Sequence, residues 1–240
     1  MTWFKQWFNS EYYHILYQNR DFQEAQHFIQ KIVEHLEIPQ NAFILDLACG
    51  KGRHSIFLNS LGYNVVGIDL SEESIQSVQH LNSSSLQFVQ GDMREVYRKE
   101  EFDYVFNLFT SFGYFEENDE NAQVIRSIAD SLKPGGIALI DFLNERQVRA
   151  KLPLSEVKRL DDIDFHIEKF EEDGFVVKSI TFNHEGSTNK YSERVRLFDL
   201  VDFEHFFDQA GLSLIDVFGN YSLDGLSKGS DRLIMLVQKP

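Results

Sequence analysis

Residues 44–55 of the chain read Ile44-Leu-Asp-Leu-Ala-Cys-Gly-Lys-Gly-Arg-His-Ser55, an apolar run that ends in an acid and passes through two glycines into a helical pattern. Glycines at such a turn let the backbone pass close to a ligand, and the N-terminus of a helix offers unpaired N–H groups. This stretch therefore predicts a buried strand, a tight turn and a helix that together surround a bound ligand.

The segments on either side repeat this alternation. Short apolar runs alternate with amphipathic stretches over residues 41–142, which is typical of βα units and a largely parallel sheet. The expected strands are Ala42–Leu47, Asn64–Ile68, Leu86–Val89, Phe102–Leu108 and Ile137–Phe142, and the expected helices are Phe22–Leu36, Ser55–Ser60, Ser71–His80 and Asn118–Leu132. The predicted fold class is α/β: a Rossmann-like, doubly wound, mostly parallel sheet with helices on both faces.

The pattern changes after residue 150. Three strand-like runs, Asp164–Phe170, Phe175–Asn183 and Lys190–Leu200, follow one another through short turns, which predicts a small antiparallel sheet inserted into the fold. A helix at Val201–Ala210 and strands at Leu212–Phe218 and Arg232–Val237 then complete the core. We expect four regions: an N-terminal helical segment that covers the site (1–40), a ligand-binding core (41–150), the antiparallel insertion as a lid or dimer sheet (151–200), and the closing helix and strands (201–240).

The amino-acid composition argues against several classes of function. The 240 residues include 23 basic and 38 acidic side chains, a net charge of −15, which argues against nucleic acid and anionic membranes as partners. The single cysteine, Cys49, excludes an intramolecular disulfide and a cysteine-based zinc cluster, and no metal site is expected. The chain has neither a signal-peptide pattern nor an apolar run approaching ~18 residues, so a cytoplasmic protein is expected.

Two classes of ligand site fit the turn after the first strand. A dinucleotide fingerprint needs glycine three residues after Gly52, where this chain has Ser55. The alternative is a resemblance to class I S-adenosylmethionine (SAM)-dependent methyltransferases, although Ala48 stands where that family often has a first glycine. The resemblance rests on five motifs in order: Asp46–Gly52, Val65–Ser71, Gly91–Met93, Phe102–Asn107 and Leu132–Gly136.

The resemblance implies SAM as cofactor and assigns roles to residues at the strand ends. Asp69 would bind the ribose hydroxyls, and Asp92 would accept from the amino group of adenine. Ligands of open α/β sheets do bind at the carboxyl ends of the strands, and a carboxylate is a strong acceptor for a diol. Cys49 is expected to be a small packed residue rather than a nucleophile. The cofactor-binding residues so implied are Tyr13, Arg20, Asp46, Ala48, Cys49, Gly50, Arg53, Asp69, Leu70, Asp92, Met93 and Asn107.

The acceptor is expected to be a small molecule. The segment after Asn107 lacks the Pro-Pro-aromatic signature of DNA methyltransferases that act on exocyclic amines, whereas Thr110–Phe115 and the tyrosines before Arg20 resemble small-molecule N-methyltransferases. Transfer to nitrogen rather than oxygen is expected, by in-line displacement. If a general base is used, Tyr17 and Tyr114 are the catalytic candidates, with His166 as a further one. These aromatic segments either close over the site or simply pack the N-terminal helix onto the sheet.

Two other functions remain open at this point. The first is a SAM-binding protein without catalysis, and the second is a NAD-dependent oxidoreductase, which shares an acid at the end of the second strand. The expected partners are a small-molecule methyl acceptor, without nucleic acid or membrane, and the chain is expected to be a monomer or homodimer.

Overall fold

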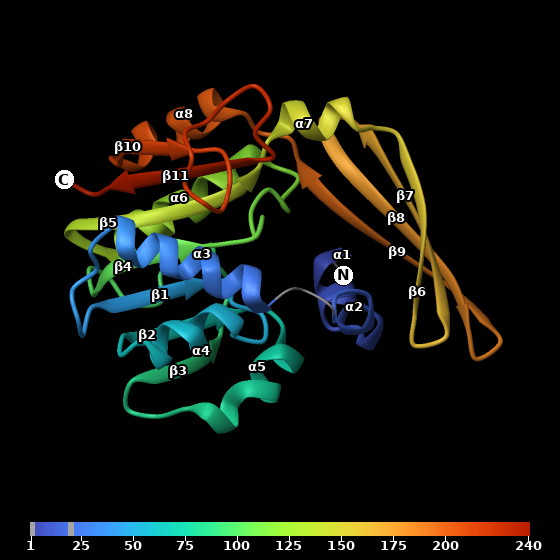
Figure 1. Cartoon of the computed structure of the whole chain (residues 1–240), viewed down its shortest axis with the longest axis horizontal. Coiled ribbons are helices and arrows are strands. Elements are labelled where there is room, and N and C mark those ends of the chain that lie inside the picture. The colour runs from blue at the N-terminus through green and yellow to red at the C-terminus, as the bar shows by residue number, and fades with distance from the viewer. Residues whose placement is uncertain (1–2, 19–21) are drawn as a thin grey trace.

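A seven-stranded sheet forms the centre of the protein. The structure, a computed structural model, describes residues 3–18 and 22–240. The strand order is β10-β11-β5-β4-β1-β2-β3, and β1 to β5 pair in parallel whereas β11 runs antiparallel to β5 and β10 (Figure 1). The strands are β1 (Phe43–Leu47), β2 (Asn64–Asp69), β3 (Leu86–Gln90), β4 (Phe102–Asn107), β5 (Leu132–Leu143), β10 (Ser213–Phe218) and β11 (Arg232–Gln238). This confirms the predicted fold class.

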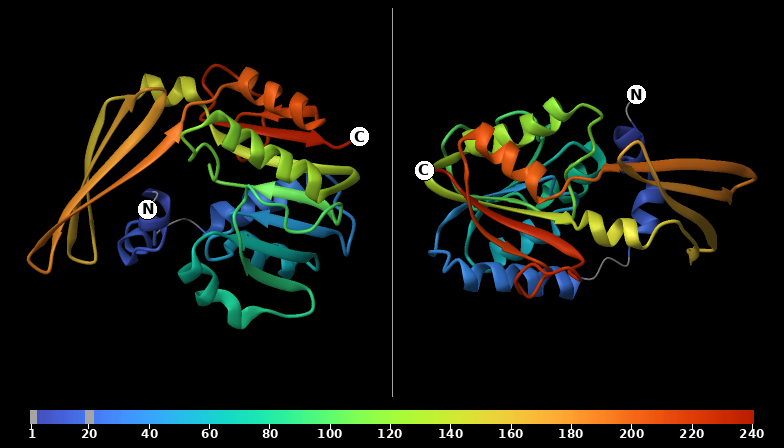
Figure 2. Two further views of the ribbon diagram at one scale, coloured as in Figure 1. Left: turned by 180° about the vertical axis from the view of Figure 1, so that it is seen from behind. Right: turned by 90° about the horizontal axis from the view of Figure 1, so that it is seen from above.

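Helices cover both faces of this sheet, as the views from front and behind show (Figures 1 and 2). One face packs against α3 (Phe22–His35), α4 (Arg53–Ser60) and α5 (Glu72–Val78), which is followed by a short 3₁₀ turn (Gln79–Leu81). The other face packs against α6 (Asn118–Ser131) and α8 (Leu200–Ala210). The two resulting clusters of buried side chains fix the sheet from both sides, so the carboxyl ends of its strands form a rigid edge.

Local sequence explains where several helices begin and end. Ser71, the predicted N-cap of α5, accepts a hydrogen bond from the N–H of Ser74. Asp199 and Asp202 form a capping box at the start of α8, and Gly211 ends that helix with a φ of 71°. Helix α4 begins two residues earlier than predicted, at Arg53, directly after Gly52.

The antiparallel sheet has four strands rather than the three that the sequence predicted. They are β6 (Leu154–Leu160), β7 (Ile163–Glu172), β8 (Phe175–His184) and β9 (Ser187–Arg196), in that order across the sheet. Strand β6 was missed because it has no buried face: its side chains are exposed or half-buried throughout, so its sequence carries no apolar alternation. The short helix α7 (Glu145–Ala150), which joins this sheet to β5, was missed as well.

The first two helices, α1 (Trp3–Phe8) and α2 (Glu11–Leu16), lie against one face of the antiparallel sheet (Figures 1 and 2). Trp7 and Leu16 are buried there among apolar side chains of β7 and β8, which makes a third hydrophobic cluster. This cluster contains Ile163, Phe165, Ile167, Ile180 and Phe182.

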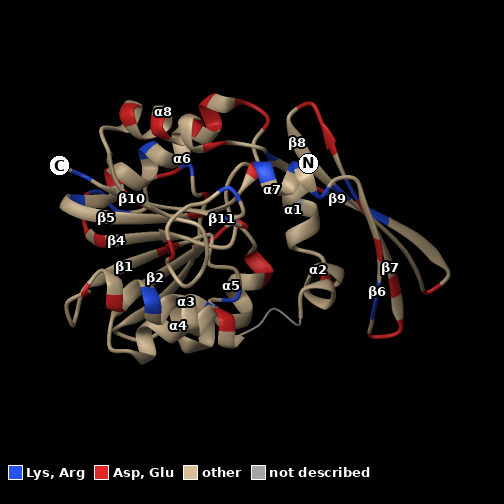
Figure 3. Ribbon diagram, turned by 45° about the horizontal axis from the view of Figure 1, so that its top comes forward, with Lys and Arg blue, Asp and Glu red and all other residues tan. Residues whose placement is uncertain are grey.

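The many acidic side chains on the surface agree with the excess of acidic over basic residues in the sequence. Acidic side chains are spread over α8 and over the antiparallel sheet (Figure 3). Among the residues that the structure describes, no helix combines the length and the apolar character that crossing a membrane requires.

Candidate active site

A cavity of about 460 Å³ lies at the carboxyl ends of β1, β2 and β4. Ligands of open α/β sheets bind at this edge, beside the point where the strand order reverses. Its walls come from the turn after β1, the ends of β2 and β3, the loop after β4, the helices α1 and α2, and strand β9. Eleven of the sequence-predicted site residues line this single cavity: Tyr13, Tyr17, Ala48, Cys49, Gly50, Arg53, Asp69, Leu70, Asp92, Met93 and Tyr114.

The turn between β1 and α4 brings backbone close to the cavity. Ala48, Gly50 and Gly52 have φ values of 63°, 57° and 69°, so the chain passes through the left-handed region three times within five residues. A Cβ at Gly52 would lie 2.4 Å from the Phe88 ring, which leaves room for glycine alone. Cys49 is buried inside the turn, where burial raises the pKa of its thiol, as suits a packed side chain.

Asp69 is positioned by two backbone N–H groups. Its Oδ2 accepts from the N–H of Gly50 at 2.8 Å, and its Oδ1 accepts from the N–H of Ser71, also at 2.8 Å. Burial raises the pKa of this carboxyl, and the two N–H groups counteract that rise. A carboxylate has about four lone-pair sites, so two remain for a pair of neighbouring hydroxyls in the cavity.

The Asp69→Asn variant should bind SAM at least about tenfold more weakly. A neutral acceptor replaces a charged one, at a cost on the order of 1.5–3 kcal/mol, and the new amide NH₂ also faces an N–H donor of Gly50 or Ser71. Calorimetry with SAM measures the change, and circular dichroism checks the fold. An unchanged dissociation constant in a folded variant would contradict the ribose-binding role.

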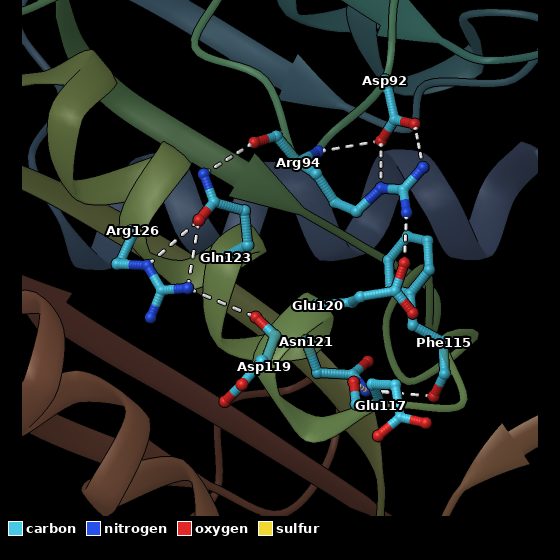
Figure 4. A network of polar contacts seen from close by, with 9 residues as sticks. All are labelled: Asp92, Arg94, Phe115, Glu117, Asp119, Glu120, Asn121, Gln123 and Arg126. Carbon is cyan, nitrogen blue, oxygen red and sulfur yellow. Dashed lines mark hydrogen bonds and ion pairs between the residues drawn. The ribbon is translucent and has the colours of Figure 1, made fainter.

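Asp92 is held by an arginine in a network that Figure 4 shows. Arg94 Nε donates to Asp92 Oδ1 at 3.0 Å and Nη2 donates to Oδ2 at 2.5 Å, while Nη1 donates to Glu120 Oε1 at 2.5 Å. The Arg94 guanidinium also stacks on the Phe115 ring at 4.4 Å. This two-bond clamp fixes the plane of the Asp92 carboxylate at the cavity wall and leaves acceptor capacity for an amino group.

Two predicted cofactor-binding residues lie behind the cavity rather than among the described residues that line it. Asp46 is fully buried, and its Oδ2 accepts from the Ser55 hydroxyl at 2.5 Å. The buried Asn107 amide donates to the carbonyls of Leu47 and Ser111 at 3.1 and 3.2 Å. Both therefore shape the loops that form the wall. Arg20 lies outside the described residues.

Replacing Asp46 with Asn should stabilise the fold at neutral pH. Burial raises the pKa of Asp46 to about 6, although the Ser55 hydrogen bond counteracts this. Because the folded pKa lies above the unfolded value, the folded state loses stability as pH rises from about 4 to 6, by about 3 kcal/mol. Urea unfolding at pH 4 and pH 7.5 should show that Asp46→Asn removes this loss; an unchanged pH slope would contradict it.

Aromatic rings form a further part of the cavity wall, which we call the aromatic end. Trp3, Phe8 and Tyr114 pack edge to face or tilted at centroid distances of 5.5–5.7 Å, and Tyr13 packs on Tyr17 at 4.9 Å. Of the two predicted catalytic tyrosines, Tyr114 donates to the carbonyl of Thr110 at 2.8 Å and Tyr17 donates to Glu193 on β9 at 2.6 Å. His166 is exposed on the antiparallel sheet and is not among the described residues that line the cavity.

Sequence reasoning missed the residues that support the loop after β4. Phe109 and Thr110 both line the cavity with left-handed φ values of 57° and 60°. The buried Asp141 on β5 holds them: its Oδ2 accepts from the N–H of Phe109 at 2.8 Å, and its backbone carbonyl accepts from the N–H of Thr110 at 3.0 Å. Arg232 on β11 donates to both Asp141 and Thr110 at 2.8 Å. The sequence offered one signal that could have pointed to Asp141: the apolar run Ile137–Leu143 contains a single acid.

The residues present fit SAM. The crowded turn after β1 allows backbone contact, the Asp69 carboxylate suits a diol, and the Asp92 carboxylate suits an amino group. The aromatic end suits a sulfonium, because a cation is attracted to ring faces. The cavity also falls in the size range of small-molecule sites, roughly 300–1,000 Å³.

Comparison with known proteins agrees with this geometry. Residues 44–136 match the family described as a methyltransferase domain. YqeM of Bacillus subtilis (strain 168), a protein named as a methyltransferase, is 32% identical over 213 residues, covering 84% of this chain and 86% of that protein.

A second relative and one solved structure extend the comparison. A Streptomyces venezuelae dTDP-3-amino-3,4,6-trideoxy-alpha-D-glucopyranose N,N-dimethyltransferase is 31% identical over 104 residues, or 43% of each chain. The crystal structure of a SAM-dependent methyltransferase from Clostridium acetobutylicum ATCC 824 has a TM-score of 0.80 at 20% identity, covering 95% of this chain and 96% of that one. With its five motifs, its strand order and its similarity to YqeM along most of both chains, this protein belongs to the class I SAM-dependent methyltransferases.

Proposed function

We propose that the enzyme methylates a nitrogen atom of a small-molecule acceptor. The observation that carries the proposal is that one cavity is lined both by the carboxylates of Asp69 and Asp92 and by aromatic rings with tyrosine hydroxyls and the Glu193 carboxylate. SAM supplies a methyl group on a positively charged sulfur. The aromatic end is the place where an acceptor can meet that group.

We assign the cofactor end as follows. Asp69 binds the ribose hydroxyls, Asp92 binds the amino group of adenine, and the turn at Ala48–Gly50 contacts the methionine part. Leu70 and Met93, which line the same end, supply apolar contacts. Asp46 and Asn107 support this end from behind, through their hydrogen bonds to Ser55 and to the Leu47 and Ser111 carbonyls.

The protein contributes mainly positioning and exclusion of water. Holding two reactants in line can supply a large part of the rate enhancement, and a closed site strengthens electrostatic interactions. Tyr17 and Tyr114 line the acceptor end with hydroxyls held by Glu193 and by the Thr110 carbonyl, so their positions are set before an acceptor enters. Both are therefore candidates to orient the acceptor.

A small acceptor is supported over nucleic acid by charge and by shape. The chain has a net charge of −15, and its surface lacks the excess of basic side chains that phosphate contacts require. The aromatic wall is formed partly by α1 and α2, and the cavity volume of about 460 Å³ suits a small molecule. The amino-sugar dimethyltransferase from Streptomyces venezuelae is consistent with nitrogen as the atom that is methylated.

Two measurements test the proposal. Calorimetry should detect SAM and S-adenosylhomocysteine binding, with nicotinamide cofactors as the control; binding of NAD instead would point to an oxidoreductase. A panel of amines, alcohols and carboxylic acids, followed by S-adenosylhomocysteine release, should then show turnover with amines. Binding of SAM without turnover on any class would favour a non-catalytic SAM-binding protein.

A further inference from the structure

We propose that Glu193 is the residue that binds the acceptor nitrogen and selects a protonated amine over an alcohol. This role rests on the proposed function, because it names the acceptor group for the same cavity. Glu193 lies on β9, at the part of the antiparallel sheet that faces α1 and α2, and its side chain lines the aromatic end of the cavity. Its carboxylate is mostly buried, with 18% of the side chain exposed.

Two hydrogen-bond donors and one cation, from three parts of the fold, surround this carboxylate. Trp7 Nε1 on α1 donates to Oε1 at 2.7 Å, and the Tyr17 hydroxyl, directly after α2, donates to the same oxygen at 2.6 Å. Lys178 Nζ on β8 lies 3.7 Å from Oε2, beyond hydrogen-bond distance, and donates to the Tyr17 hydroxyl. Trp7 is 1% exposed, so one wall of the arrangement is part of the hydrophobic core.

This geometry leaves Oε2 as the oxygen that can accept from a ligand. Oε1 already takes both short hydrogen bonds, whereas within residues 3–18 and 22–240 Oε2 has only the longer contact with Lys178. Two donors on one oxygen restrict the rotation of the carboxylate, so the second oxygen has a defined position. A preorganised, partly buried carboxylate is a strong acceptor for a charged N–H donor.

The surroundings favour a cation over a neutral hydroxyl. The rings of Trp3, Phe8, Tyr13 and Tyr114 line the cavity with Glu193, and a positive charge near ring faces is stabilised. Lys178 contacts the carboxylate but is not among the described residues that line the cavity, so a ligand meets the acid and not the base. Among the residues that the structure describes, Lys178 from β8 and Tyr17, directly after α2, are the titratable groups in contact with Glu193.

Glu193 can also accept the proton that the acceptor nitrogen has to lose. An ammonium nitrogen must lose one proton before it can act as a nucleophile. In the proposed step an N–H bond breaks, an O–H bond forms at Glu193 Oε2, and the electron pair stays on nitrogen as the attacking lone pair. The proton leaves Glu193 for water after the product dissociates, so no other reactant is needed.

The test uses equilibrium binding and one matched pair of variants. Protein saturated with S-adenosylhomocysteine is titrated with cyclohexylammonium and with cyclohexanol in a calorimeter. The wild type should bind the amine at least about tenfold more tightly than the alcohol, and Glu193→Gln should remove this preference. Glu156→Gln, which neutralises an acid of the same sheet paired with Lys169 at 3.5 Å, should retain it.

The outcomes separate this role from the proposed function. S-adenosylhomocysteine affinity should stay within about twofold in both variants, since glutamine can still accept from Trp7 and Tyr17. An equal loss of S-adenosylhomocysteine and amine binding in Glu193→Gln would show a structural role and overturn the assignment, as would an unchanged preference. Failure of the wild type to bind S-adenosylhomocysteine would instead contradict the proposed function.

A second probe keeps the proposal testable if Glu193→Gln does not fold. N,N,N-trimethylcyclohexylammonium has the same charge and ring but no N–H to donate. The wild type should bind cyclohexylammonium more tightly than this quaternary analogue. Equal affinities would mean that the aromatic rings alone recognise the cation, and Glu193 would lose its role.

Discussion

A chain that begins at Phe22 should bind SAM at least about a hundredfold more weakly than the full chain and show no measurable turnover. Residues from α1 and α2 supply much of the cavity wall, including Trp3, Phe8, Tyr13 and Tyr17. Without them the aromatic end is open to water, and Glu193 loses both of its short hydrogen bonds. Calorimetry with SAM, at a temperature where the shortened chain remains folded, measures the effect.

A control variant distinguishes loss of the cavity wall from loss of hydrophobic packing under the antiparallel sheet. Leu16 is buried at 6% exposure in the cluster beneath the antiparallel sheet, but it is not among the described residues that line the cavity. Leu16→Ala should cost about 2–5 kcal/mol of stability and leave SAM affinity nearly unchanged. If the shortened chain behaves like Leu16→Ala, with a lower melting temperature and normal SAM affinity, the N-terminal segment is packing rather than a cover.

Replacing Arg232 with Met should lower the free energy of unfolding by about 3–5 kcal/mol. Arg232 is the cationic partner of Asp141, which is fully buried, and its removal leaves that carboxylate uncompensated. The left-handed Phe109–Thr110 loop also loses a hydrogen bond from Arg232 to Thr110. Urea unfolding of the variant at pH 7.5 gives the change.

Two further measurements identify the cause. The double variant Arg232→Met with Asp141→Asn should recover part of the lost stability, because it removes the unpaired charge. Burial raises the pKa of Asp141 already in the wild type, and loss of Arg232 should raise it further. The folded variant then binds a proton more tightly than the unfolded chain, so its stability should recover as pH falls. A loss that is independent of pH would contradict this account.

The parallel sheet could be predicted from sequence because its strands are buried on both faces and read as short apolar runs. The glycine turn at 50–52 and two acids at strand ends, Asp69 and Asp92, predicted part of the cavity wall, because ligands of open α/β sheets bind at the carboxyl ends of the strands. Strand β6 could not be predicted, because Leu154–Leu160 has no buried face to leave an apolar period.

The acceptor side depends on contacts between residues far apart in the chain. Glu193 is 186 residues from Trp7 and 176 from Tyr17, and nothing in the sequence around it distinguishes it from other acids of the insertion. For Asp46 and Asn107, sequence reasoning was limited in a different way. Their positions in the motifs are as expected, but only the three-dimensional structure shows that their side chains bond to Ser55 and to loop carbonyls behind the cavity wall.

The third hydrophobic cluster joins α1 and α2 to β7 and β8, so the unit that shapes the acceptor end is built from two stretches of the gene separated by the whole parallel part of the main sheet. A chimera that exchanged only the antiparallel sheet with that of a relative would set foreign side chains against Trp7 and Leu16. Residues 3–17 and 154–196 should therefore be transplanted together when acceptor preference is re-engineered. For the same reason, substitutions in these two segments are expected to accumulate in pairs during divergence, while the strand-end residues proposed to bind SAM stay as they are.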